Sequence, residues 1–524
     1  MLRTRTARII SWILFACCFA GACVFVSMHI QQLTNSDMAG DLLRAQLLAE
    51  EGKLFSENWY YSTELYSIHT YLIFAPFFHL TQNWYVIRVA GTVVCYALLM
   101  AGLWFLGREA KLRQLFPLVG AFFLLPLSDP YFDNMIKGVH YIPYVACAFF
   151  IFGLLLRSSK PVKAVRLYVT ILLAAVISLM IGLGGMRMVL TFYMPIACTA
   201  ALLWPISKRR PECCSRQQAV RFTAGTGAAC TAALLGCMLN TAVLSKRYSF
   251  RSYADLQFTD FSLERLLTVF QDWLNFWGYR KGPVFSITLL HNVVALLLIG
   301  ALALALIRCI KNRETSIEHV LLSVFYAAAC LIYFALFAVT DVTHFETYHL
   351  PISVFGLLLA ATSLMESKTC LQKAAAWLLT AAVVLCGAMG FAEVAQKDST
   401  QELREIAEYL VEDEYEAGYA TFWSGNVMTE LSSGELEMYV WLGGECDNID
   451  QTYKWLQRKS HDTQTPEGPV FVLLERKYLG VYAISNQLSP ADQVYETENY
   501  LVYGYDDYET MKWCMEAAME ESEW

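Results

Sequence analysis

The sequence predicts an α-helical polytopic membrane protein of about eleven transmembrane helices, followed by a small C-terminal extracytoplasmic α/β domain. Of the 524 residues, 56% are hydrophobic and only 16% are charged, whereas soluble proteins carry charge on about 25% of their residues. The apolar residues also gather in runs long enough to cross a bilayer. These observations exclude a soluble enzyme, a disordered scaffold and a fibrous repeat.

Charge divides the chain into two parts, 1–392 and 393–524. The second part holds 28 acidic and 8 basic side chains and has a net charge of −20, whereas the first has a net charge of +12. We therefore expect a transmembrane domain in the first part and an acidic extracytoplasmic domain in the second. Neither part has the basic groove with interleaved aromatic residues that a nucleic acid needs, so no nucleic-acid partner is expected.

Ten stretches have the apolar length of a membrane span. They are 9–30, 85–106, 139–156, 166–183, 188–206, 221–244, 285–308, 319–340, 349–365 and 372–392. An eleventh stretch, 115–127, is short for a span. Basic residues cluster before the first span and in alternate loops, and all of them lie on the same side of the membrane only if 115–127 also crosses. The positive-inside rule then places the N-terminus in the cytoplasm and the C-terminal domain outside the plasma membrane.

The first external stretch, 31–84, predicts two helices at the membrane surface. The run Asn35-Ser36-Asp37 offers an N-cap for a helix over 38–51. The apolar face of this helix suits the membrane interface, which leaves Asp41 at the solvated surface. The second apolar stretch, 66–80, is too short to cross comfortably, so we interpret it as interfacial or re-entrant.

This arrangement resembles the GT-C superfamily of membrane glycosyltransferases. The resemblance covers the topology of 1–392: a first span that leads to Ser36-Asp37, an external stretch with two helices, then many spans. These enzymes take sugar from a polyprenyl-phosphate donor, and they include protein mannosyltransferases and lipid A aminoarabinose transferases. The resemblance implies that an acid of the first external stretch lies at the active site, here Asp37, with Asp41 one turn later. The adjacent acidic pair of the mannosyltransferases is absent, which favours a base over a metal ligand.

The chemistry of the reaction leads to the same residue. Glycosyl transfer from a lipid phosphate needs a carboxylate for the proton of the acceptor hydroxyl, cations for the departing phosphate, and apolar surface for the prenyl chain. Asp37 ends the first span at the depth where that bond must break, so we expect it to act as the catalytic base. The alternative is that Asp37 only complements the N-terminus of helix 38–51, a common role for an acidic residue.

Cations at the same membrane face are candidates for binding the sugar phosphate. Arg187 follows two glycines in a tight turn, where backbone amides and a guanidinium suit a phosphate, although an arginine at a span end can also snorkel to lipid headgroups. Arg88, inside the second span, either holds the donor phosphate or pairs with an acid such as Glu64. The predicted substrate-binding residues are Asp41, Arg44, Glu64, Arg88, Lys137, His140 and Arg187.

A second group of metal-capable side chains lies in 341–349. His344, Glu346 and His349 could bind a divalent ion, but no zinc spacing is present, and a hydrogen-bonded cluster is the stronger interpretation. No cofactor is therefore expected to be required, and a divalent cation stays an open alternative. The sequence also has no Gly-x-Ser-x-Gly elbow and no Walker phosphate loop, which argues against a serine hydrolase and a primary pump.

The acidic domain is predicted to be a small α/β fold. We expect helices over 398–416 and 449–459, and strands over 418–423, 427–431, 436–441, 469–475 and 499–505. Its aromatic side chains could stack on sugar rings, but at such spacing they are more often core; they include Trp423, Tyr439, Trp441 and Trp455. An oxidising compartment would permit a disulfide between Cys446 and Cys514.

The leading interpretation is a bacterial-type hexosyl- or pentosyltransferase that works by inverting transfer. The resemblance implies a polyprenyl-phosphate-linked sugar as donor and an extracytoplasmic acceptor, such as a cell-envelope glycan, lipid or protein, with membrane lipids around it. A transporter or flippase of lipid-linked sugars is the alternative, although most span centres are purely apolar and no internal repeat is found. A third interpretation is a non-catalytic membrane protein that presents its external domain.

Overall fold

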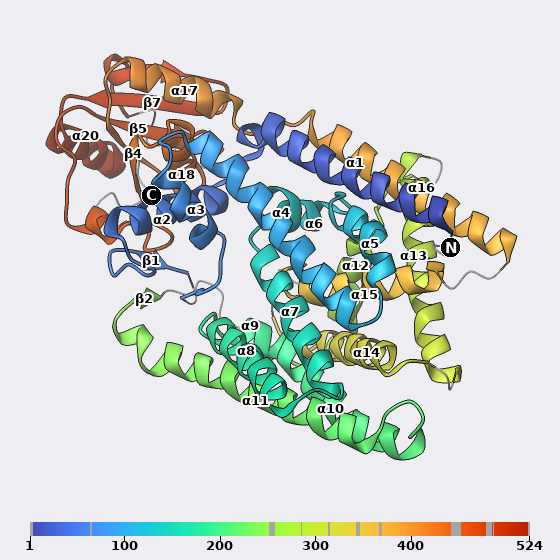
Figure 1. Cartoon of the computed structure of the whole chain (residues 1–524). Coiled ribbons are helices and arrows are strands. Elements are labelled where there is room, and N and C mark those ends of the chain that lie inside the picture. Colours follow the sequence, from blue (N-terminus) through green and yellow to red (C-terminus); the bar gives the residue numbers. More distant parts are fainter. Residues whose placement is uncertain are drawn as a thin grey trace.

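The chain folds into a multi-pass bundle of long apolar helices with a small α/β domain at one end (Figure 1). The computed structural model describes residues 4–62, 65–250, 257–283, 286–312, 315–341, 346–365, 369–441, 452–477, 485 and 487–521. Within these residues, nine helical stretches are long and apolar enough to cross a membrane. The predicted fold class, a polytopic helical membrane protein with a C-terminal α/β domain, is therefore confirmed.

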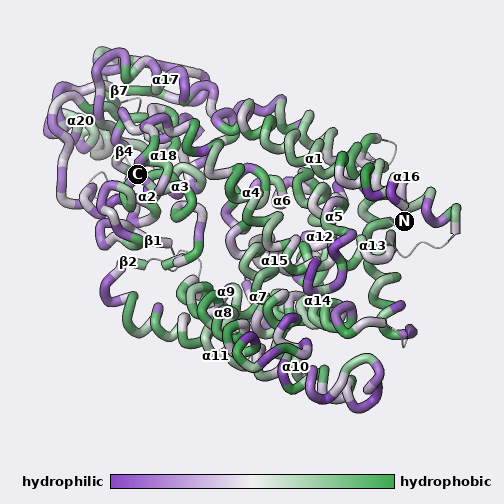
Figure 2. The backbone as a smooth tube through the Cα atoms, viewed as in Figure 1, coloured by the Kyte–Doolittle hydropathy of each residue, from purple (hydrophilic) through white to green (hydrophobic). Residues whose placement is uncertain are grey.

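The membrane part consists of helices joined mostly by short loops. Its helices are α1 (Arg5–His29), α2 (Ser36–Glu51), α3 (Tyr71–Phe78), α4 (Trp84–Glu109), α5 (Phe116–Phe123), α6 (Asp129–Tyr131), the π-helix η3 (Phe132–Lys137), α7 (Ile142–Ser159), α8 (Ala164–Gly182), α9 (Met186–Met188), the π-helix η4 (Val189–Tyr193), α10 (Met194–Arg209), α11 (Arg216–Ala242), α12 (Leu263–Phe276), α13 (Ile287–Lys311), α14 (Ile317–Phe337), α15 (Glu346–Met365) and α16 (Cys370–Val394). Figure 2 shows that hydrophobic residues dominate the long helices, whereas hydrophilic residues are frequent in the C-terminal domain and the loops.

Helix ends alternate between two faces of this bundle. At one of them, the basic face, Lys160 after α7 lies 2.8 Å from the carboxylate of Glu109 at the end of α4. At the same face, Lys111 lies 2.8 Å from the carboxylate of Glu318 at the start of α14. The opposite face, the domain face, carries α2, α3 and the C-terminal domain (Figure 1). The predicted basic loops around Lys111 and Lys160 therefore share one face of the bundle.

The stretch 115–127 forms part of an interrupted crossing. Its helix α5 has 8 residues and rises about 12 Å, much less than the hydrocarbon core of a bilayer. Near the basic face, the rings of Trp12 and Phe116 lie 5.6 Å apart. Further on, the hydroxyl of Tyr96 in α4 donates to the carbonyl of Ile136 at 2.6 Å. The chain from α5 through η3 thus runs alongside α1 and α4 to the domain face.

Helix α15 lies beside the nine long apolar helices, and Ser353–Leu364 is its described apolar part. It has 20 residues, and near its end the carbonyl of Ser363 accepts a hydrogen bond from Arg308, close to the end of α13. Helix α15 therefore ends at the basic face. The described residues thus hold nine helical stretches of spanning length beside α15 and the interrupted crossing, and the count of eleven spans stays a prediction.

The C-terminal domain is a five-stranded sheet with helices on both sides. Its sheet has the order β4-β3-β5-β7-β6, in which β3 pairs in parallel with β4 and β5, and β7 pairs antiparallel with β5 and β6. Helices α17 and α18 cover one face of the sheet and α20 covers the other. The elements are α17 (Gln401–Glu412), β3 (Ala417–Ala420), α18 (Phe422–Leu431), β4 (Glu437–Val440), β5 (Val470–Glu475), β6 (Gln493–Glu496), β7 (Tyr500–Tyr505) and α20 (Tyr508–Glu521).

Two predicted elements of this domain are wrong. The expected strand 427–431 is the second half of α18, which buries Val427 and Met428 against the sheet. The expected helix 449–459 is not helical over 452–458, where the chain makes isolated bridges to neighbouring segments instead. Of the aromatic residues considered for sugar binding, Tyr439 and Trp441 are buried in the core. Cys446 lies outside the described residues.

Candidate active site

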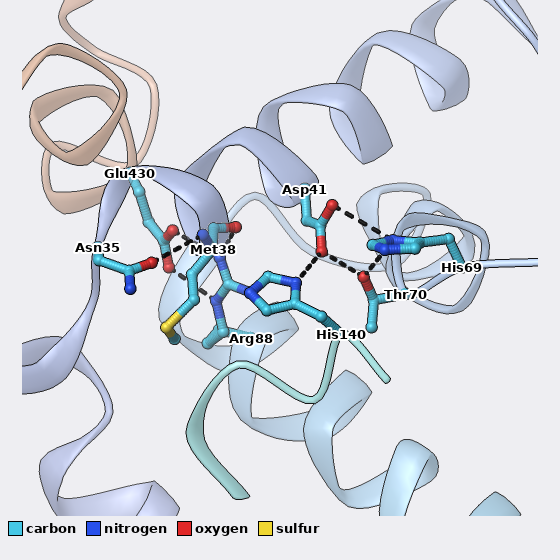
Figure 3. A network of polar contacts seen from close by, with 8 residues as sticks. All are labelled: Asn35, Met38, Asp41, His69, Thr70, Arg88, His140 and Glu430. Carbon is cyan, nitrogen blue, oxygen red and sulfur yellow. Dashed lines mark hydrogen bonds and ion pairs between the residues drawn. The ribbon is translucent and has the colours of Figure 1, made fainter. Parts of the chain in front are cut away.

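A cluster of polar side chains surrounds Asp41 at the domain face (Figure 3). The Asp41 carboxylate lies 2.9 Å from Nδ1 of His140 and 3.3 Å from Nδ1 of His69. It also accepts a hydrogen bond from the hydroxyl of Thr70, and this hydroxyl lies 2.9 Å from Nδ1 of His69. These four residues, the Asp41 cluster, come from α2, from the segment before α3 and from the segment before α7.

Helix α2 positions the acidic residues of this site. Of the three residues predicted to offer the cap, the side chain of Asn35 caps its N-terminus, and Gly52 with φ 62° ends it. The helix packs against the C-terminal domain, where a Cβ at Gly40 would lie 3.2 Å from Cβ of Leu456. The expectation that Asp41 lies at a solvated surface is therefore wrong: the domain covers α2, and Asp41 is only 8% exposed.

The histidine segments follow strained backbone. Val139, directly before His140, has φ 52°, and Tyr66, three residues before the other histidine, has φ 45°. Bulky side chains rarely adopt this left-handed conformation, and such strain persists only where the surrounding structure enforces it. A Cβ at Gly138 would lie 2.7 Å from Nε2 of His140 and 2.5 Å from the carbonyl oxygen of Asp133, so glycine is needed at this position.

The two carboxylates of α2 have opposite electrostatic surroundings. Burial opposes ionisation of Asp41, but His69 and His140 outweigh it and hold the pKa of this carboxyl well below its ordinary value. Burial raises the pKa of Asp37, and the charge of Asp41 adds to this effect, while His140 and Lys137 counteract it. Asp41 is therefore a stable anion, whereas Asp37 holds a proton more readily.

Arg88 is fully enclosed and binds an acid of the C-terminal domain (Figure 3). Its Nε donates to Glu430 at 2.8 Å and its Nη2 donates to the second carboxylate oxygen at 2.6 Å. The same Nη2 donates to the carbonyl of Met38 at 2.7 Å. The predicted alternative that Arg88 pairs with an acid agrees with this geometry, with Glu430 as the acid. The arginine thereby ties α4 and α2 to α18.

Arg44 is held by aromatic side chains. Its guanidinium lies 3.5 Å from the ring centroid of Tyr71 and 4.3 Å from that of Tyr61, in the short strand β1 (Tyr60–Tyr61). Its Nη2 donates to the carbonyl of Leu65 at 3.0 Å, and the residue is only 4% exposed. These contacts connect α2 with β1, with the segment before α3 and with α3 itself.

Arg187 and Lys137 border the cluster. Arg187 donates a hydrogen bond to the hydroxyl of Tyr141, the residue that follows His140. Lys137 at the end of η3 lies 2.9 Å from the carboxylate of Asp133. Lys137 is thereby held close enough for its charge to act on Asp37, and Arg187 reaches the segment that carries His140 from α9.

The structure brings together one group of the predicted site residues: Asp37, Asp41, Lys137 and His140, with Arg187 beside them. Arg44 and Arg88 lie near this group but are buried in contacts with the protein itself. The remaining predicted residues lie outside the described part of the chain: Glu64, His344 and the side chains of Glu346 and His349.

Sequence reasoning missed His69, Thr70 and Glu430. The pair His69-Thr70 interrupts the apolar stretch 66–80, and two adjacent polar residues in such a stretch are the signal that could have identified them. No local pattern marks Glu430, because its partner Arg88 lies 342 positions away in the sequence.

The Asp41 cluster has a donor set that fits a divalent cation. Asp41, His69 and His140 each offer one ligand atom, and these atoms lie within 4.8 Å of one another. Two imidazoles and one carboxylate suit zinc and other first-row transition metals. The predicted alternative, a cation at 341–349, concerns a different segment, much of which lies outside the described residues.

Comparison with known proteins rests on structure alone, because no family model and no curated protein sequence matches the chain. The fold is similar to that of ArnT from Cupriavidus metallidurans, solved bound to undecaprenyl phosphate, with a TM-score of 0.57 and 10% identity over 94% of this chain and 97% of that one. The oligosaccharyltransferase of Archaeoglobus fulgidus in complex with Zn and sulfate gives a TM-score of 0.48 and 11% identity over 87% of this chain and 68% of that one.

The likeness to ArnT extends over the helical bundle and the C-terminal domain together, since it includes nearly the whole of both chains. In this protein that range includes the first long helix, the stretch with α2 and α3, the many-helix bundle and the C-terminal domain. The chain thus has the fold of ArnT, in agreement with the fold that the resemblance to the GT-C superfamily implies.

Proposed function

We infer that this protein is a membrane glycosyltransferase that moves a sugar from a polyprenyl-phosphate donor to an acceptor at the domain face. The observation that carries the proposal is the pair of acids Asp37 and Asp41, which lie with His140 at the end of the first span in a GT-C fold. The undecaprenyl phosphate bound to ArnT supports the donor class. The charge distribution supports placing the domain face outside the cytoplasm.

The proposed reaction is an inverting displacement. The oxygen of an acceptor hydroxyl attacks the anomeric carbon of the donor sugar, its proton passes to the carboxylate of Asp37, and the bond from the sugar to the phosphate breaks. Polyprenyl phosphate leaves with the bonding electrons. Lys137 and Arg187 stabilise the charge that develops on this phosphate. Asp41 orients His69 and His140 beside the reacting groups through its contacts with both Nδ1 atoms.

The Asp41 cluster is also the proposed position of a divalent cation, which when bound would neutralise phosphate charge. Metal analysis of the purified protein tests this assignment without an activity assay. We expect about one equivalent of a transition metal in the parent protein and in Glu57→Gln, and a loss of at least tenfold in His69→Ala and His140→Ala. Equal metal content in all four proteins would refute the cation but not the transferase.

The transferase itself is tested with purified protein in detergent and a panel of radiolabelled polyprenyl-phosphate sugars. Asp37→Asn should lower the rate of sugar release from the lipid by at least a hundredfold. Glu57→Gln is the matched control, because Glu57 belongs to the same external stretch but is exposed and paired with Arg247. An unchanged rate in Asp37→Asn removes Asp37 from the chemistry. Flipping of intact labelled lipid in proteoliposomes, without any transfer product, would support the flippase instead.

A further inference from the structure

A groove opens at the basic face, at the opposite end of the bundle from the Asp41 cluster. It lies between the end of α7 and the start of α8 and encloses about 470 Å³. Its lining includes Leu154, Arg157, Lys163, Arg166, Val169 and Leu173. We call this site the basic groove.

The cations of the basic groove form no ion pairs with acidic side chains among the described residues. In the described part of the chain, no acidic side chain forms an ion pair with Arg157, Lys163 or Arg166. The neighbouring Lys160 behaves differently, because it lies 2.8 Å from the carboxylate of Glu109. Three positive charges thus meet at the mouth of a groove without a counter-ion from the protein, which favours an anionic ligand.

The start of α8 adds hydrogen-bond donors to these charges. Lys163 is its N-cap and makes no side-chain cap, and the first turn carries no acidic residue. The first amides of the helix therefore lack a partner from the helix itself, and the positive end of the helix dipole lies where Lys163, Val165 and Arg166 line the groove. Amides and cations in this arrangement suit a phosphate group.

The remainder of the groove is apolar and open to lipid. From Arg166 to Leu173 the helix rises about 10 Å, which is the distance from a headgroup to the upper part of an acyl chain. Val165 and Tyr168 on the same helix are 76% and 72% exposed. Only 22% of the apolar stretch of α8 is buried inside the protein. In a membrane these side chains contact hydrocarbon, so the occupant of the groove is an amphiphile.

We propose that the basic groove binds an anionic phospholipid of the leaflet at the basic face, with its phosphate at Arg157, Lys163 and Arg166 and one acyl chain along Val169 and Leu173. The charge of the groove selects an anionic headgroup, and its apolar wall distinguishes a lipid from a free phosphate. This site is independent of the proposed sugar transfer, which takes place at the other face.

The test measures phospholipid retained by purified full-length protein. Protein exchanged into micelles containing equal amounts of dioleoyl phosphatidylglycerol and dioleoyl phosphatidylcholine is passed through gel filtration, and bound lipid is quantified by mass spectrometry. The parent should retain phosphatidylglycerol at least tenfold over phosphatidylcholine. The combined substitutions Arg157→Gln, Lys163→Gln and Arg166→Gln should abolish this preference.

The control removes the same charge elsewhere on the basic face. The combined substitutions Lys208→Gln, Arg209→Gln and Arg216→Gln should change retention by less than twofold, because these residues do not line the groove. Val169→Trp fills the apolar part without changing charge and should lower retention at least fivefold. Equal loss in both charge-reduced proteins, or full retention in Val169→Trp, would overturn the proposal. All variants are compared by gel filtration and thermal unfolding, so that a folding defect is recognised.

Discussion

Asp37 and Asp41 lie one turn apart on α2, yet their pKa values are shifted in opposite directions. Two histidines and a threonine surround Asp41 and stabilise its anion. Among the described residues no pair of histidines contacts Asp37 in this way, and burial raises its pKa. Paired carboxyl groups whose pKa values are driven apart are typical of sites with separate proton-transfer and electrostatic roles. This difference makes Asp37 the better base, although Asp41 makes more contacts.

The raised pKa of Asp37 gives a stability prediction with a definite sign. Since the folded pKa exceeds the unfolded value of about 3.9, the contribution of Asp37 is most favourable below that value and is lost as the pH rises through the folded pKa. Asp37→Asn should therefore raise the thermal unfolding midpoint at pH 8 and change it little near pH 4, while transfer is lost. Unfolding scans across this pH range check the prediction, and a midpoint gain that does not grow with pH contradicts it.

The buried pair of Arg88 and Glu430 predicts strong coupling between the domain and the bundle. Arg88→Met leaves the Glu430 carboxylate buried without its partner, which is expected to cost about 3–5 kcal/mol of unfolding free energy because the side chains are only 1% and 7% exposed. The double substitution with Glu430→Met should recover most of this loss. Denaturant unfolding in detergent measures the cycle, and additive effects of the two substitutions would argue against a direct pair.

At the scale of elements, the segment between η3 and α7 determines where His140 lies. Gly138→Ala should displace the imidazole, because the added Cβ would lie within 2.7 Å of Nε2 and meet the carbonyl of Asp133. We expect at least a tenfold loss of transfer with normal expression. Gly227→Ala in α11 is the matched control, because nothing lies within 4 Å of its Cβ position. Normal activity in Gly138→Ala would show that the site tolerates movement of His140.

Elements with a strong local pattern were predictable, and elements defined by distant contacts were not. The helix 38–51, preceded by the predicted cap in Asn35-Ser36-Asp37, and the strands 469–475 and 499–505 correspond to α2, β5 and β7. The pattern of 427–431 suits a strand or a helix, so the predicted strand is wrong where packing on the sheet selects the helix α18. The Asp41 cluster joins three segments up to 99 residues apart, a distance that a sequence pattern does not encode.

At the scale of the whole molecule, the two faces of the bundle should be exposed to different compartments. The positive-inside rule predicts that the basic face lies in the cytoplasm. A membrane-impermeant maleimide applied to intact cells should label Glu498→Cys, in the C-terminal domain, above the level of the parent chain. It should label Lys163→Cys, at the basic face, only after the cells are permeabilised. The reverse pattern would invert the orientation and place sugar transfer in the cytoplasm.

The interrupted crossing determines when this part of the chain can enter the bilayer. Breaks between short helices leave backbone groups that hydrocarbon cannot solvate, and every residue from 115 to 127 is buried inside the protein. Alone, this stretch would expose those groups to lipid tails, so its transfer from the translocon into the bilayer is unfavourable. Its partition into the membrane becomes favourable once α1 and α4 are in place to cover it. Assembly of the bundle therefore depends on the order in which the helices are synthesised.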